Sequence, residues 1–167
     1  MYPEQPRQQW QSGGQQRRFE QGNPPPDGTT QKGIDGKVKA KEWIIKGINQ
    51  EAITFAEEFA KYLQKKGLTT SQIRAAFGEV RRIQMRGINE TFNSDLLLLK
   101  PKLAYAEVRK SGVNQGAVEA AKDIRLVLSA AIDAVIDGDT QTKESRFHNF
   151  AAFFEAILAY HRANGGK

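Results

Sequence analysis

The sequence contains no cysteine among its 167 residues and only two histidines. Without cysteine, the chain can form no disulfide bond, no thiolate metal site and no cysteine nucleophile, and a reducing compartment suits it. Long apolar runs are also missing, since the longest strongly apolar run is Leu96–Leu99, far too short to cross a bilayer. The N-terminal residues hold no apolar signal core. We therefore expect a cytoplasmic protein that does not enter a membrane.

Acidic residues are fewer than basic residues in this sequence. The 25 lysine and arginine residues exceed the 19 aspartate and glutamate residues, which gives a formal net charge of +6 and a pI of about 9.6. This balance favours an anionic partner such as a nucleic acid over a cationic one. The length suits one domain of ordinary size, with enough residues to bury a hydrophobic core.

Proline is nearly absent beyond residue 33, where the composition of the chain changes. Residues 1–33 contain five of the six prolines and eight glutamines. Their bulky apolar side chains are limited to Met1, Tyr2, Trp10 and Phe19. A segment with so little apolar surface cannot offset the entropy that it loses on ordering. We therefore predict a disordered tail over residues 1–33 and one domain over residues 34–167.

No segment alternates apolar and polar residues as a half-buried strand would, and from residue 34 onward the apolar residues recur at helical spacing. The spacing predicts one short helix and five longer ones. The short helix covers residues 37–48, and the longer helices cover residues 49–66, 69–86, 93–110, 117–137 and 143–163. We therefore expect an all-α fold, a compact bundle of about five helices.

Two of these helices carry recognisable local signals. Thr69 and Gln72 form a capping box at the start of the helix over residues 69–86. Asn93 or Ser94 is expected to cap the helix that follows. Pro101 lies within that helix, and because proline has no amide proton, it should kink the helix or restart it at a new first turn.

Recognisable catalytic and metal-binding motifs are missing as well. His148 and His161 are thirteen positions apart on one predicted helix. They point about 140° away from each other at 3.6 residues per turn, so they cannot bind one metal ion from that helix alone. The sequence holds no glycine-rich phosphate loop, nucleophile elbow or HExxH helix. We expect no catalytic residue, no metal site and no cofactor, and we expect the phenylalanines of the last helix to fill the core.

Basic residues gather on single faces of three predicted helices. Arg74 and Arg81 are seven positions apart and so lie within about 20° of each other, with Gly78 between them. The side chains that we predict to bind nucleic-acid phosphates are Arg74, Arg81 and Arg82 on the first of these helices, Lys100, Lys102, Tyr105 and Arg109 on the second, and Lys122 and Arg125 on the third. Gly78 weakens its helix relative to alanine, and it leaves a low point where a phosphate can approach.

Each basic face, taken alone, has the composition of an ordinary solvated helix surface. Three such faces in a chain of high positive charge favour contacts with the phosphate backbone of a nucleic acid, and the spacing gives no sign of base-specific recognition. The residues leave an alternative open: a helical module for protein–protein interaction or self-assembly that does not bind RNA directly. An uncharacterised hydrolase is a more distant alternative.

Three stretches of the sequence together resemble the small subunit of type III-A CRISPR effector complexes, the Csm family. The first is Leu68–Arg74 (LTTSQIR), at the opening of a predicted helix. The second is Leu98–Tyr105 (LLKPKLAY), and the third is Phe153–His161 (FFEAILAYH), followed by Gly165–Lys167. The resemblance covers about residues 49–167 and leaves the proline-rich tail outside.

The resemblance implies a non-catalytic scaffold that is present in several copies within an RNA-guided complex of antiviral defence. It implies contacts with guide RNA and target RNA, with the backbone and large subunits, and with neighbouring copies of the chain. By position, Arg74 and Lys102 match the family motifs. The other predicted RNA-binding residues rest on the face argument alone.

Overall fold

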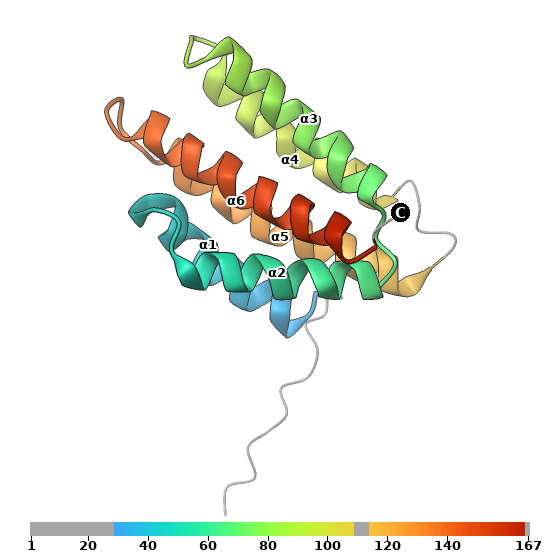
Figure 1. Cartoon of the computed structure of the whole chain (residues 1–167). Coiled ribbons are helices and arrows are strands. Elements are labelled where there is room, and N and C mark those ends of the chain that lie inside the picture. Colours follow the sequence, from blue (N-terminus) through green and yellow to red (C-terminus); the bar gives the residue numbers. More distant parts are fainter. Residues whose placement is uncertain (1–28, 109–113, 166–167) are drawn as a thin grey trace, which may run out of the picture.

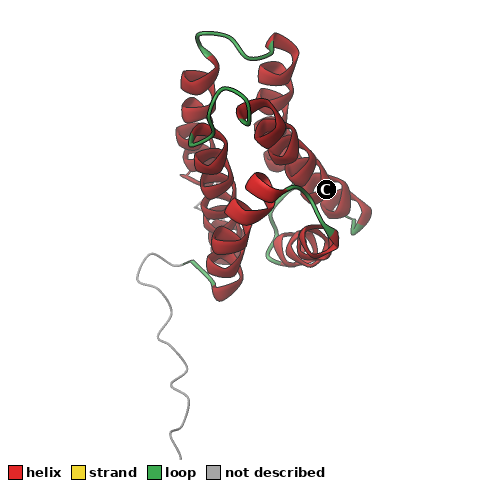
Figure 2. Cartoon of the chain, turned by 90° about the vertical axis from the view of Figure 1, so that its left-hand side faces the viewer, coloured by secondary structure: helices red, strands yellow, loops and turns green. Residues whose placement is uncertain are grey.

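The structure, a computed structural model, describes residues 29–108 and 114–165, with the backbone alone described for residues 105–108. These ranges contain six α-helices and no strand (Figure 2). The helices are α1 (Gln31–Lys46), α2 (Gln50–Lys65), α3 (Thr70–Arg86), α4 (Phe92–Val108), α5 (Gln115–Ile136) and α6 (Lys143–Ala163). The predicted all-α fold is confirmed. The number of helices is six in place of about five, because the short helix expected over residues 37–48 is a full helix of 16 residues.

The six helices form two layers of three (Figure 1). Helices α2, α6 and α3 lie side by side in the front layer, and α1, α5 and α4 lie behind them. Consecutive helices form three helical hairpins, each closed by a short loop. The α5/α6 hairpin lies between the α1/α2 hairpin and the α3/α4 hairpin, so the last hairpin in the sequence forms the centre of the bundle.

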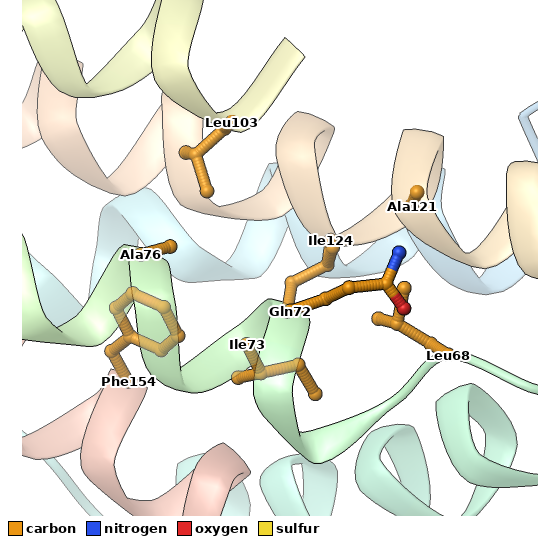
Figure 3. Close-up of a pocket in the computed structure, with 8 residues that line it drawn as sticks. All are labelled: Leu68, Gln72, Ile73, Ala76, Leu103, Ala121, Ile124 and Phe154. Carbon is orange, nitrogen blue, oxygen red and sulfur yellow. The ribbon is translucent and has the colours of Figure 1, made fainter. Parts of the chain in front are cut away.

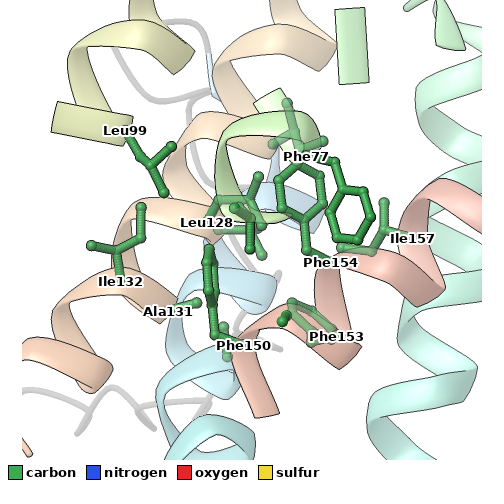
Figure 4. Close-up of a cluster of buried hydrophobic side chains, with 14 of the residues drawn as sticks. Phe77, Leu99, Leu128, Ala131, Ile132, Phe150, Phe153, Phe154 and Ile157 are labelled. Carbon is green, nitrogen blue, oxygen red and sulfur yellow. The ribbon is translucent and has the colours of Figure 1, made fainter. Parts of the chain in front are cut away.

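The core is built around α6 and α5 (Figure 4). The phenylalanines of α6 lie in the core as expected, and Phe153 and Phe154 are buried. The ring of Phe154 meets that of Phe77 on α3 edge-on, with the ring centroids 5.3 Å apart. The ring of Phe153 lies 5.5 Å from that of Trp43 on α1. Aromatic contacts therefore join α6 to both outer hairpins.

Helix α1 begins six residues earlier than the sequence predicts, because its first turns pack on α5. Thr30 is its N-cap residue. The backbone N–H of Thr30 donates to Oδ1 of Asp123 at 2.8 Å, and the Thr30 hydroxyl donates to Oδ2 at 2.7 Å. A Cβ atom on Gly33 would lie 2.3 Å from the same Oδ1. Glycine, which weakens an isolated helix, is therefore what lets α1 approach α5 this closely.

Asp123 is a fully buried carboxylate that joins three helices. Besides the two hydrogen bonds from Thr30, it accepts one from the hydroxyl of Tyr62 on α2 at 2.6 Å. Burial raises the pKa of the Tyr62 hydroxyl, which keeps the proton in place for this bond. A buried charge is tolerated only when hydrogen bonds compensate it, and three donors do so here.

The capping box at the start of α3 is confirmed. The N–H of Thr69 donates to Oε1 of Gln72 at 2.9 Å, and the N–H of Gln72 donates back to the Thr69 hydroxyl oxygen at 3.4 Å. A left-handed glycine lies just before it, since Gly67 has a φ of +90°. Local sequence signals alone fix this boundary.

The predicted cap of α4 was wrong. The helix begins at Phe92, so Asn93 and Ser94 lie within its first turn. The reason is tertiary packing, because Phe92 is buried with its ring 5.1 Å from that of Phe147. Pro101 neither ends nor restarts α4, which continues through it to Val108. Pro101 lies on the exposed side, where water can bond the carbonyl that the missing amide leaves free.

Most of the predicted disordered tail, residues 1–28, lies outside the described residues, and residues 31–33 belong to α1. Among the helices that the structure describes, none has the length and apolar composition needed to cross a bilayer.

Candidate nucleic-acid interface

The arginines of α3 lie outside the face of the helix that packs in the core. Arg74 and Arg81 are exposed, as is Gly78 between them. A Cβ atom on Gly78 would meet no other atom within 4 Å, so the backbone is open to approach at this point. This agrees with the low point predicted from the sequence. Within the described part of the chain, Arg74 has no carboxylate at ion-pair distance.

Arg81 is held in place by three neighbours. Its guanidinium carbon lies 5.5 Å from the centre of the Phe77 ring, and its Nη1 donates to Oε1 of Gln84 at 2.9 Å. Its Nη2 lies 3.7 Å from the carboxylate of Glu155 on α6. The guanidinium therefore lies along the front layer between α3 and α6, with about half of its surface exposed.

Two of the predicted basic faces meet at Glu79. Arg82 on α3 and Lys102 on α4 both donate to the same carboxylate oxygen of Glu79, Oε2. The side chains of Arg82 and Lys102 are 56% and 48% exposed, and that of Glu79 is 30% exposed. The hydrogen bond from Lys102 holds the pKa of the Glu79 carboxyl below its ordinary value, so the group is ionised at neutral pH. We call these three residues the Glu79 cluster.

A second ion pair joins the other end of the same two helices. Nη1 of Arg86, in the last turn of α3, lies 3.0 Å from Oδ2 of Asp95 in the first turn of α4. The Glu79 cluster and this pair both join α3 to α4 on the outer side of the hairpin, along a line of contact that we call the outer seam. The seam carries three cations and two carboxylates, so its local charge is positive.

Lys100 and the basic residues of α5 lie elsewhere. Lys100 pairs with Asp133 on α5, while Lys102, two positions further, turns towards α3. Lys122 and Arg125 are half-buried on α5, in the back layer, and so they do not extend the α3 face. The backbone of Tyr105 belongs to α4, but its side chain and the whole of Arg109 lie outside the described residues. The structure therefore brings two of the three predicted faces together.

The sequence-based reasoning missed Glu79. Its i,i+3 spacing to Arg82 is a known signal for an ion pair on one helix. Its second partner, Lys102, is 23 residues away and could be found only from the packing of α3 against α4.

The described residues contain no group of three or more acidic, histidine or cysteine side chains that could hold a metal ion. His148 is exposed, whereas His161 is buried. Nε2 of His161 donates to the carbonyl of Leu68 at 2.9 Å, which leaves Nδ1 to accept from the Thr70 hydroxyl at 3.1 Å. Burial lowers the pKa of His161, so the ring is neutral. Its role is to fix the α2–α3 turn against α6.

A small apolar pocket opens between α3, α4, α5 and α6 (Figure 3). Its volume of about 20 Å³ holds little more than one water molecule. Gln72 is the polar residue among its lining side chains, which otherwise include Ile73, Leu103, Ile124 and Phe154. Such a pocket has no group that could act as an acid, base or nucleophile.

Comparison with known proteins gives a match to a protein family. The model of the family described as Csm2 Type III-A matches residues 48–167, which include all helices except α1. No curated protein and no solved structure matches the chain significantly.

Proposed function

Since the chain belongs to the Csm2 family and is thus a small subunit of a type III-A CRISPR complex, we propose that it binds the phosphate backbone of guide and target RNA without reading their sequence. In this proposal it performs no catalysis. It scaffolds a complex of antiviral defence, in contact with the backbone and large subunits and with neighbouring copies of itself.

The observation that carries the proposal is the exposed basic surface of the α3/α4 hairpin. Arg74 and Arg81 flank an open backbone at Gly78, and Lys102 brings a further cation from α4. Guanidinium and ammonium groups bind phosphate oxygens through charge-assisted hydrogen bonds, which carry no sequence information. The surface has no groove-reading helix and no described row of exposed aromatic rings, so backbone binding is the function that it suits best.

Exposed apolar residues on the same hairpin support a protein partner. Leu97 and Leu98 on α4 are 48% and 55% exposed, and Met85 near the end of α3 is 88% exposed. Large apolar side chains that remain exposed together often mark a contact with another protein. Leu98 lies one helical turn from Lys102, so a protein contact here would adjoin the basic surface.

A salt titration of RNA binding tests the proposal. Wild-type protein, Arg82→Ala and Lys102→Ala are titrated with two unrelated single-stranded RNAs, both as the free chain and in the reconstituted complex. Each phosphate contact contributes about −0.7 to the log–log slope of affinity against salt, so each variant should flatten the slope by about that amount. Binding should weaken equally for both RNAs.

Lys41→Ala is the matched control, because it removes one exposed positive charge from α1, at the opposite edge of the bundle. It should leave the slope unchanged. Equal slopes for all four proteins, or a strong preference for one RNA, would contradict the proposal.

The ion pairs of Arg82, Lys100 and Lys102 favour one alternative, a protein-interaction module that does not bind RNA directly. This alternative predicts that no variant changes RNA binding by the free chain, although Leu98→Ser would still prevent assembly of the complex.

A further inference from the structure

Glu79 lies where two cations from two helices converge. Arg82 approaches from one turn further along α3, and Lys102 approaches from α4. Nη2 of Arg82 and Nζ of Lys102 both contact Oε2 of Glu79, so these two nitrogens are close enough to each other to share one ligand. The Glu79 cluster is therefore a preformed two-cation site with an internal anion in place.

The ligand that such a site selects is an oxyanion. A phosphate oxygen accepts hydrogen bonds from guanidinium and ammonium groups in the same manner as a carboxylate oxygen. Glu79 therefore occupies the position that an RNA phosphate would take between Arg82 and Lys102.

The charges of the Glu79 cluster determine how strongly this surface can bind RNA. Arg82 and Lys102 contribute two positive charges, and the ionised Glu79 cancels one of them. We infer that Glu79 competes with the RNA backbone for Arg82 and Lys102. Glu79 must release these two side chains before they bind a phosphate, and this competition lowers the affinity of the surface for RNA. This inference rests on the proposed function, since it names a residue that tunes that same surface.

The ion pairs of Glu79 with Arg82 and Lys102 can break without unfolding the protein. Each of the two cations has about half of its side chain exposed, and exposed ion pairs of this kind are weak and screened by salt. The α3/α4 hairpin does not depend on the cluster for its fold, because buried residues such as Val80 and Leu99 also pack in the core and Arg86 still pairs with Asp95.

The decisive variant is Glu79→Gln, which keeps the shape of the side chain and removes its charge. One additional phosphate contact multiplies affinity by about fourfold at 0.15 M salt, because affinity varies with salt to the power of about −0.7 for each contact on a single strand. We expect Glu79→Gln to bind single-stranded RNA about fourfold more tightly than the wild type, with a slope steeper by about 0.7. Thermal unfolding of the same samples checks that both proteins are folded.

Glu57→Gln is the matched control, because it also removes one negative charge and frees one cation, Lys61, on α2 in the opposite hairpin. It should leave RNA affinity nearly unchanged. A gain as large as that of Glu79→Gln would show a general effect of net charge and would overturn the inference.

Two further outcomes are distinguishable. If Arg82→Ala and Lys102→Ala weaken RNA binding but Glu79→Gln does not strengthen it, the surface binds phosphate and Glu79 only supports its shape, so the inference is wrong and the proposed function stands. If none of these variants changes binding, the proposed function and the inference are both wrong. A reversal of the gain in the double variant Glu79→Gln with Lys102→Ala would support the inference.

Discussion

Thr30 and Asp123 are 93 residues apart in sequence, yet Asp123 accepts two hydrogen bonds from Thr30, one from its N–H at 2.8 Å and one from its hydroxyl at 2.7 Å. The carboxylate therefore satisfies, from α5, backbone and side-chain donors at the first turn of α1. Helix α1 lies before the residues that the family model matches, and this contact is what fixes its start to the family-matched part of the chain.

Asp123→Asn should lower the free energy of unfolding by about 1–3 kcal/mol. The new amide group replaces one acceptor by a donor, so at least one buried donor of Thr30 or Tyr62 loses its partner. Urea denaturation followed by circular dichroism measures the change. Glu90→Gln, an exposed loop carboxylate, should stay within about 0.5 kcal/mol of the wild type. An equal effect of both variants would contradict the role given to Asp123.

Gly36→Ala should destabilise the protein although alanine favours helices. A Cβ atom at this position would lie 2.7 Å from Cγ2 of Val127, a buried residue of α5, and 2.5 Å from the ring of Phe55. Overpacking of this kind costs about 1–3 kcal/mol, more than the helix propensity returns. Urea denaturation is the measurement, and an unchanged midpoint would show that α1 shifts away from α5 at little cost.

Gly78→Ala should have the opposite effect on stability. The position is exposed in the middle of α3, and the added Cβ meets no atom. The free energy of unfolding should rise by about 1 kcal/mol, the difference in helix propensity between alanine and glycine. The same variant should bind RNA more weakly if a phosphate approaches the backbone here, and the salt titration described above measures that. A stabilised variant with unchanged RNA binding would remove Gly78 from the proposed surface.

Stability should fall as the pH drops below about 6.5, the ordinary pKa of histidine. Burial lowers the pKa of His161 in the folded state, so the unfolded chain takes up this proton first and gains stability relative to the fold. The loss continues down to the lowered pKa of the folded state. It is measured by urea denaturation between pH 5 and pH 8. His161→Gln should flatten this dependence, whereas His148→Gln, at an exposed position, should keep it.

The boundaries of α3 could be predicted because their signals are local. Thr69 and Gln72 need only each other to form a capping box, and Gly67 ends α2 through its own conformation. The start of α1 could not be predicted, since Gly33 and Gly36 read as helix-weakening residues until α5 is known to pack against them. The prediction of where α4 begins failed for the same reason, because the packing of Phe92 against Phe147 of α6 determines that position.

The candidate surface was predicted in part. Helical spacing was enough to put Arg74 and Arg81 on one face, and the structure agrees. Spacing could not tell that Lys102 turns towards α3 while Lys100 turns towards α5, because both outcomes suit a half-exposed lysine. The carboxylates that the cations meet come mostly from other helices, and their positions depend on tertiary packing.

The central place of the α5/α6 hairpin has a consequence for how the chain acquires its fold during synthesis. Helices α1 to α4 leave the ribosome first, but the surfaces on which they pack belong to residues 115–163, which are made later. Until then, Trp43 and Phe77 have no partner for the faces that α6 will cover. Non-local contacts of this kind slow folding and leave apolar surface open to chaperones, so the nascent chain should reach its native state only once residues 115–163 have been made.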